Sequence, residues 1–173
     1  MAAFWRSGYK GTSLTDLETA TGLTKGSLYK AFEDKHDLFI KSLEMYLLQS
    51  REMIFTAMTS SGTAIERLSG WTQLAEANCS KGGCLALKAS DELAAEDPDV
   101  RKLLTDHWHS LEAFLSEIVA AGHKEGSIRN DLPIPTIVTL LTRVAMGTVV
   151  AAPLSDGDDP AAAMRTAIGL IKS

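Results

Sequence analysis

Apolar residues recur every three or four positions along most of the chain, a spacing typical of α-helices that bury one face. Stretches in which apolar and polar residues alternate, the pattern of half-buried β-strands, are scarce. We therefore expect an all-α protein with about nine helices, three of them small. The expected helices cover residues 2–8, 14–21, 25–32, 35–59, 64–78, 84–96, 98–125, 133–152 and 160–171.

Two of the small helices are predicted to follow one another across a tight glycine turn. Ser13 is a favourable N-cap for the first of them, and Gly22 offers the left-handed residue that often ends a helix. Thr24 caps the second helix, in which Leu28 and Phe32 form an apolar pair one turn apart. This arrangement is a helix-turn-helix, and its second helix has small and polar side chains on its free face.

The helix-turn-helix leads into the long helix predicted over residues 35–59. We therefore divide the chain into an N-terminal domain of residues 1–46 and a helical domain of residues 47–173. The N-terminal domain is expected to have a truncated first helix, because residues 2–8 supply only about two turns.

The net charge of −5 is unevenly distributed. Residues 1–50 hold six Lys or Arg against six Asp or Glu, so the whole negative charge lies in the later part of the chain. Nucleic-acid-binding domains are usually basic. Any contact with DNA would therefore depend on a few well-placed cations and on backbone amides.

Other classes of protein find little support in the sequence. No signal peptide or membrane-spanning run is expected, since the longest apolar-rich stretch, residues 134–153, contains Arg143. Cys79 and Cys84 are too few for a disulfide scaffold, which favours the reducing cytoplasm. We find no catalytic Ser/His/Asp or Cys/His grouping, no phosphate-binding glycine loop and no metal-ligand spacing. We expect no enzyme activity, no cofactor and no metal.

The stretch GYKGTSLTDLETATGLTKGSLYKAFEDKHDLF, residues 8–39, resembles the DNA-binding domain of TetR-type bacterial transcriptional regulators. The matching positions are Gly8, Tyr9, Thr12, Ser13, Gly22, Leu23, Thr24, Leu28, Tyr29, Phe32, Lys35 and Leu38. The rest of the chain is similar to that family in layout, and residues 83–101, GCLALKASDELAAEDPDVR, resemble a segment found in a subset of it. The resemblance implies a ligand-responsive regulator, most often a repressor, that dimerises on a palindromic DNA operator and is released by a small-molecule effector.

Within a helix-turn-helix, the N-terminal half of the second helix enters the major groove while nearby helix ends hold phosphates. Lys25 can donate to guanine, and the small Gly26 lets the helix approach the bases closely. The candidates for base contact are Thr24, Lys25, Gly26 and Ser27. The candidates for phosphate contact are Thr12, Ser13, Tyr29, Lys30, Lys35 and His36. The alternative is a three-helix structural module without a role in DNA binding.

The helices after residue 63 carry bulky apolar residues. We interpret each of them first as a core residue, and a subset could instead line an effector cavity between helices. The candidates are Trp71, Leu74, Leu87, Trp108, Leu111, Leu115 and Met146. The last two helices are apolar on more than one side and rich in small residues, which predicts a homodimer interface. The alternative is that they close a monomeric core.

Cys84 is the one candidate for reactive chemistry. It follows two glycines at the expected N-terminus of a helix, a position at which thiols become more reactive. This suggests an alternative function, a regulator that senses redox state or electrophiles through Cys84. A further alternative is a helical protein-interaction module without DNA binding, which the neutral charge of residues 1–50 favours.

Overall fold

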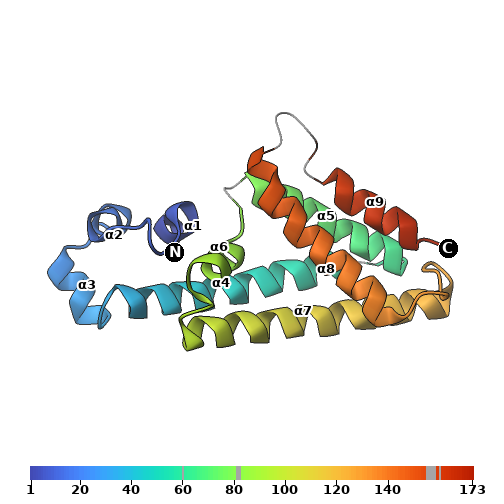
Figure 1. Ribbon diagram of the computed structural model, residues 1–173, viewed down its shortest axis with the longest axis horizontal. Coiled ribbons are helices and arrows are strands. Elements are labelled where there is room, and N and C mark those ends of the chain that lie inside the picture. Colours follow the sequence, from blue (N-terminus) through green and yellow to red (C-terminus); the bar gives the residue numbers. More distant parts are fainter. Residues whose placement is uncertain (60, 81–82, 155–158, 160) are drawn as a thin grey trace. The chain divides into compact units, whose positions relative to one another are not determined.

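The computed structural model describes residues 1–173 except 60, 81–82, 155–158 and 160. Helices dominate it, and the described ranges hold no β-strand (Figure 1). The helices are α1 (Ala2–Ser7), α2 (Leu14–Thr21), α3 (Lys25–Ala31), α4 (Lys35–Met58), α5 (Ala64–Ser80), α6 (Leu85–Leu93), α7 (Pro98–Glu125), α8 (Ile134–Ala151), the short 3-10 turn η1 (Ala152–Leu154) and α9 (Ala162–Ile171). The predicted all-α class is confirmed, and most helix ends fall within a few residues of the predicted ones.

Two details of the sequence prediction fall outside the described residues. These are Gly82, the first of the two glycines before Cys84, and Pro160, the expected start of the last helix. The side chain of Cys79 also lies outside the described part of the structure.

Side-chain caps explain why several helices begin where they do. The carboxylate of Asp34 accepts a hydrogen bond from the amide of Asp37 at 2.8 Å in the first turn of α4. Before α5, the amide of Thr63 donates to Glu66 at 2.7 Å and the amide of Glu66 donates back to the Thr63 hydroxyl at 3.3 Å. These reciprocal bonds form a capping box, which satisfies amides that have no partner within the helix.

The chain forms two compact units. The first consists of Met1–Ser50 and Cys84–Asp106, and the second consists of Arg51–Gly83 and His107–Ser173. The long helices α4 and α7 therefore each contribute residues to both units. The first unit holds α1, α2, α3 and α6 with the first parts of α4 and α7, so it combines segments that are far apart in sequence.

An aromatic cluster fixes the short α1 in the first unit. The rings of Phe4 and Phe39 meet edge to face with centroids 5.1 Å apart, and Tyr9 lies 5.0 Å from Phe39. Trp5 packs edge to face on Tyr46, 5.2 Å away. Buried aromatic residues contribute a large apolar area each, so a helix of six residues is held by its packing rather than by its own stability.

The second unit has one hydrophobic core in which α5, α8 and α9 pack against one another. Residues from the end of α4, from α7 and from the loop after α7 complete it. Its buried members are Met58, Ala64, Leu68, Trp71, Leu111, Leu115, Ile118, Val119, Ile128, Ile137, Val138, Leu141, Met164, Ala167, Ile168 and Ile171.

The stretch that contains α8 meets the usual criteria for a membrane-spanning helix, which the sequence analysis did not expect. By length and composition, Ile134–Leu154 is long and apolar enough to cross a membrane, because one Arg hardly offsets so many aliphatic residues. Core helices pass the same test, and α8 buries Ile137, Val138 and Leu141 against its neighbours. Only 28% of the apolar stretch is buried within the chain, so much of its surface is free for another contact.

Candidate DNA-binding site

A reciprocal pair of hydrogen bonds opens α2. The amide of Asp16 donates to the Ser13 hydroxyl at 3.1 Å, and the Ser13 amide donates to the Asp16 carboxylate at 2.8 Å. Hydrogen bonds from the Ser13 hydroxyl and backbone lower the pKa of Asp16, so the carboxylate stays charged at the positive end of the helix. α2 ends at Gly22, whose φ of 68° is the left-handed conformation that favours glycine.

The N-terminus of α3 is capped from two directions. The Thr24 hydroxyl accepts from the amide of Ser27 at 3.3 Å, as predicted. The carboxylate of Glu18, on α2, also accepts from the amide of Lys25 at 2.5 Å. Glu18 therefore fixes the start of α3 against α2, and sequence reasoning did not identify it because its partner lies across the turn.

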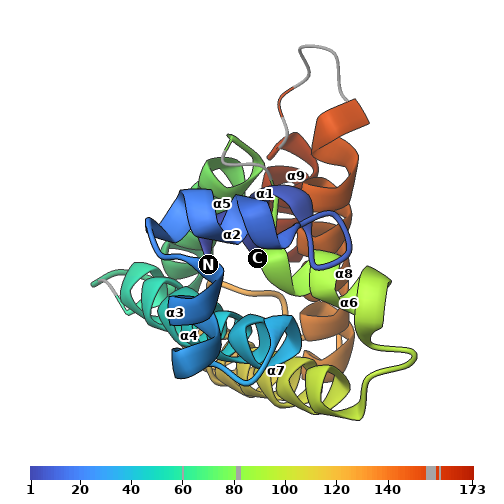
Figure 2. The ribbon, with the colours of Figure 1, turned by 90° about the vertical axis from the view of Figure 1, so that its left-hand side faces the viewer.

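α3 has one buried side chain and an exposed face. Leu28 is 2% exposed, whereas Lys25, Gly26, Ser27, Tyr29 and Lys30 are exposed. A Cβ added at Gly26 would meet no atom within 4 Å, so packing within the chain does not require glycine there. Figure 2 shows α3 joined to α2 by a short turn. The predicted division of α3 into a core position and a free face is observed.

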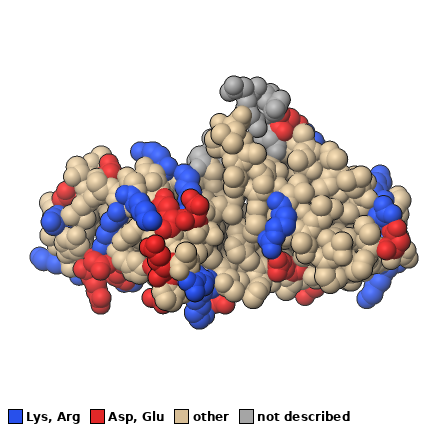
Figure 3. Space-filling model, in the orientation of Figure 1, with Lys and Arg blue, Asp and Glu red and all other residues tan. Residues whose placement is uncertain are grey.

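Two of the predicted contact residues are cations that lie over aromatic rings. The Lys35 ammonium is 4.4 Å from the centroid of Tyr9, and the Lys25 ammonium is 5.8 Å from that of Tyr29. Such contacts restrain long side chains that would otherwise be mobile. On the face shown in Figure 3, Lys and Arg side chains of this unit are interspersed with Asp and Glu, as the neutral charge of residues 1–50 indicates.

Two other predicted phosphate contacts lie in internal hydrogen bonds. Thr12 is 1% exposed, and its hydroxyl donates to the carbonyl of Gly8 at 2.6 Å. His36 Nε2 lies 2.5 Å from the carboxylate of Asp97, just before α7. Burial would raise the pKa of Asp97, but hydrogen bonds from His36 and the backbone outweigh it and lower the pKa. Both side chains therefore join parts of the first unit to one another.

Two side chains of α6 hold the end of α1 and the residues after it through three hydrogen bonds that the sequence did not reveal. The Lys88 ammonium donates to the carbonyls of Trp5 at 2.8 Å and Arg6 at 3.0 Å. One turn later, the Glu92 carboxylate accepts from the amide of Lys10 at 2.8 Å. These contacts join residues more than 80 positions apart, so no local pattern signals them.

Cys84 is the N-cap residue of α6 and is partly exposed. The hydroxyl of Tyr46, on α4, donates to its sulfur at 3.4 Å. Burial and the neighbouring sulfur raise the pKa of Tyr46, so the phenol keeps the proton that it donates. The thiol is thus held by a defined partner within the first unit.

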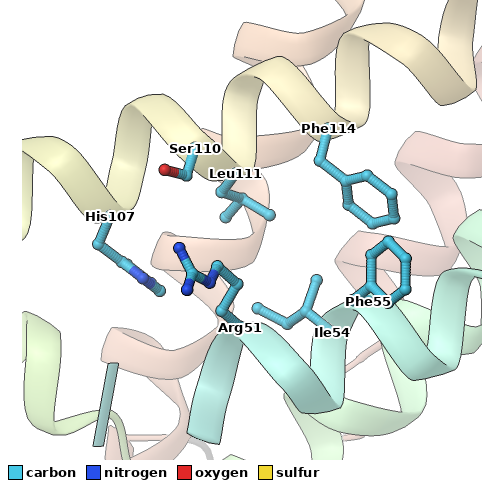
Figure 4. A pocket seen from close by; sticks show the side chains of 7 residues that line it. All are labelled: Arg51, Ile54, Phe55, His107, Ser110, Leu111 and Phe114. Atoms are coloured by element: carbon cyan, nitrogen blue, oxygen red, sulfur yellow. The ribbon is translucent and has the colours of Figure 1, made fainter. Parts of the chain in front are cut away.

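A cavity of about 130 Å³ opens between α4 and α7 in the second unit (Figure 4). Its lining residues are Arg51, Ile54, Phe55, His107, Ser110, Leu111 and Phe114. Of the residues predicted to line an effector cavity, Leu111 lines this one. Trp71, Leu74, Trp108 and Leu115 are in or against the core of the second unit, Met146 is partly buried on α8, and Leu87 belongs to the first unit.

Family models match both parts of the chain. Residues 1–41 match the model of bacterial regulatory proteins of the tetR family, and residues 65–168 match the model of the tetracyclin repressor-like C-terminal domain. The helix-turn-helix and the helical second unit therefore define a DNA-binding transcriptional regulator. The chain belongs to the TetR family.

Individual relatives agree with this assignment. The transcriptional repressor ComR of Escherichia coli is 26% identical over 162 residues, which cover 88% of this chain and 75% of ComR. A TetR-family regulator from Cytophaga hutchinsonii has the same fold, with a TM-score of 0.86 and 24% identity over 99% of this chain and 90% of that one. A regulator from Saccharomonospora viridis, solved in complex with choline, has a TM-score of 0.82 and 17% identity over 99% of this chain and 93% of that one.

Proposed function

We propose that this protein is an effector-responsive repressor that binds a palindromic operator as a homodimer. The observation that carries the proposal is the exposed face of α3. Lys25, Ser27 and Tyr29 are exposed on a short helix whose start is fixed by Thr24 and Glu18. A helix that exposes polar side chains along its N-terminal half is what reading of the major groove requires.

Each exposed group has a distinct task on DNA. The Lys25 ammonium donates to guanine O6 and N7, while Gly26 brings the backbone close to the bases. Tyr29, Lys30 and Lys35 contact phosphates on either side of the groove, together with Ser13 at the start of α2. Because the first 50 residues carry no net charge, a single copy of the helix-turn-helix binds DNA weakly and two copies are needed.

The last two helices supply the proposed dimer interface. Val150 and Leu170 are each 62% exposed, and the surface over α8 is mostly uncharged in Figure 3. A Cβ at Gly147 or Gly169 would meet no atom within 4 Å, so the chain itself leaves space beside both helices. A two-fold axis through this surface pairs it with itself and presents two α3 helices to one palindrome.

An effector would act on the spacing of the two α3 helices. α4 and α7 are shared between both units, and the cavity lies between them in the second unit. A ligand that prefers one arrangement of these helices shifts the population toward it and away from the DNA-binding form. We place this activity in the cytoplasm, where the operator is, with no cofactor or metal required.

Binding to DNA tests the proposal directly. A labelled duplex, selected by the protein from a random pool, is titrated by fluorescence anisotropy at several salt concentrations. We expect affinity to fall steeply with salt, Tyr29→Ala to weaken binding to every sequence, and Lys25→Ala to cost about 1–3 kcal/mol at one base pair and relax its preference. Lys102→Met, an exposed cation on α7, is the matched control. If neither variant is impaired, or if no duplex is selected, a protein-interaction module replaces this proposal.

Cys84 carries a second candidate function, a thiol sensor. The observation in its favour is the hydrogen bond from Tyr46, which fixes the sulfur of the partly exposed Cys84 at the N-terminus of α6. Alkylation with iodoacetamide should then lower operator affinity in the wild type and have no effect in Cys84→Ser. Unchanged affinity of the alkylated wild type would remove this function.

A further inference from the structure

The cavity between α4 and α7 has one charged wall and several apolar ones. Figure 4 shows the Arg51 guanidinium reaching from α4 toward α7, between His107 and Leu111. Ile54 lies beside Arg51, and the rings of Phe55 and Phe114 face one another beyond it. Arg51 makes no hydrogen bond or ion pair with any residue that the structure describes. A guanidinium has five donors in a planar fork, so an unpaired one beside a cavity is a ready anion site.

Arg51 is the only charged residue that lines the cavity. No Asp or Glu is among the lining residues. Burial and the nearby Arg51 charge lower the pKa of His107, so the imidazole is neutral at pH 7. A single positive charge balances one negative charge and leaves a dianion partly uncompensated. The charge of the wall therefore favours a monoanion.

The remaining walls of the cavity favour a ligand with a flat apolar group of limited size. Phe55 and Phe114 form a tilted ring pair with centroids 5.3 Å apart, and Ile54 and Leu111 supply aliphatic surface. Aromatic rings pack favourably against such a pair. The volume of about 130 Å³ is close to that of an engineered apolar cavity of about 150 Å³ that holds benzene. This volume matches one six-membered ring.

We propose that this cavity binds a monocarboxylate built on a single aromatic ring, with the carboxylate on Arg51 and the ring against Leu111 and Phe114. This inference rests on the proposed function, because it names the class of effector. Neutral His107 lies beside Arg51 and offers a second hydrogen-bonding group to the carboxylate.

The position of the site suits an effector. Arg51 and His107 are the first residues of the second unit on α4 and α7, the two helices that continue into the first unit. A carboxylate bound by both side chains links α4 to α7 at Arg51 and His107. The ligand therefore favours one spacing of α4 and α7, which is the differential contact that an effector must make.

Calorimetric titration of the full chain with benzoate and with benzamide tests the inference. Benzamide has the same ring and shape but no charge. We expect benzoate to bind saturably and at least tenfold more tightly than benzamide, since a charge-assisted pair with Arg contributes about twice as much as a neutral hydrogen bond. Arg51→Met should lose this preference, so that both compounds bind equally. Lys124→Met removes an exposed cation of α7 away from the cavity and should keep the preference. Far-UV circular dichroism verifies that each variant is folded.

A second readout locates the carboxylate without any variant. Benzoate beside His107 should raise the pKa of its imidazole, which NMR follows separately from those of the other three histidines. The absence of saturable benzoate binding to the folded wild type, or equal affinity for benzamide, overturns the inference. Operator binding is measured on the same sample without ligand. Its presence with failed benzoate binding refutes only the effector class, whereas its absence refutes the proposed function.

Discussion

Replacing Lys88 with Met measures how firmly α6 holds α1. The Lys88 ammonium donates to the carbonyls of Trp5 and Arg6 in the last turn of α1. Carbonyls at a helix C-terminus have no partner within the helix, so they depend on donors from elsewhere. Met keeps an unbranched side chain with helix propensity close to that of Lys, so the change isolates the ammonium.

The free-energy cost of removing the ammonium follows from how deeply its two hydrogen bonds are buried. The bond to Arg6 is exposed, so water replaces it, whereas the bond to Trp5 is partly buried. A hydrogen bond to a charged group contributes about 1.5–3 kcal/mol, so losing the Trp5 bond should lower the free energy of opening α1 by about 2 kcal/mol. Because about 1.4 kcal/mol corresponds to a factor of ten, α1 should open roughly 30-fold more often.

Amide hydrogen exchange reports this opening at one position. The amide of Gly8 donates to the carbonyl of Phe4 at 2.8 Å across the end of α1, so it exchanges when α1 opens. We expect it to exchange roughly 30-fold faster in Lys88→Met. The amide of Arg129, bonded to Ile171 in the second unit, should keep its rate.

The matched control is Lys102→Met. The Lys102 side chain is 76% exposed and pairs with Asp106 one turn along α7, and exposed pairs of this kind contribute little to stability. We expect no measurable change at the Gly8 amide. A wild-type exchange rate at Gly8 in Lys88→Met would refute the reasoning, because it would mean that α1 is held by its aromatic packing alone.

Three further predictions concern other parts of the fold. Gly8→Ala should lower the urea midpoint of the first unit more than Gly22→Ala, and equal losses would contradict this. Both glycines have a positive φ, of 72° and 68°, but only at Gly8 would an added Cβ displace the Glu92 carboxylate, which accepts from the amide of Lys10. The pKa of Asp97 is lowered on folding, so its contact with His36 stabilises the protein above about pH 4, and this stability is lost as the pH falls below the ordinary Asp value of 3.8. Asp97→Asn should therefore flatten the acid side of the stability curve, and an unchanged curve would argue against the contact. Leu170→Glu should leave the monomer folded but abolish dimers in sedimentation velocity, and dimers that persist would exclude α9 from the interface.

Local features of the site were predictable because they depend on neighbours in sequence. Ser13 and Thr24 cap their helices, and Gly22 takes the left-handed conformation that ends α2. Leu28 faces inward while Lys25 faces outward, as helical periodicity indicates. Helix ends and faces are set within one or two turns, so a single sequence contains them.

Contacts between residues far apart in the sequence were not predictable, because they do not depend on neighbours in the sequence. His36 was expected to contact phosphate but lies on Asp97, 61 positions away, and this contact has no signal in local periodicity. The cavity beside Arg51 depends on how far α4 and α7 stand apart, which side-chain packing decides and the spacing of apolar residues does not.

The two segments of the first unit have a consequence for protein engineering. Residues 84–106 supply Lys88, Glu92 and Asp97 to contacts made by residues 1–50. A fragment cut at residue 46 would leave the carbonyl of Trp5 and the amide of Lys10 to water. Chimeric regulators made by exchanging the N-terminal helices of two relatives should therefore also exchange α6 and the start of α7, because both segments belong to the same unit.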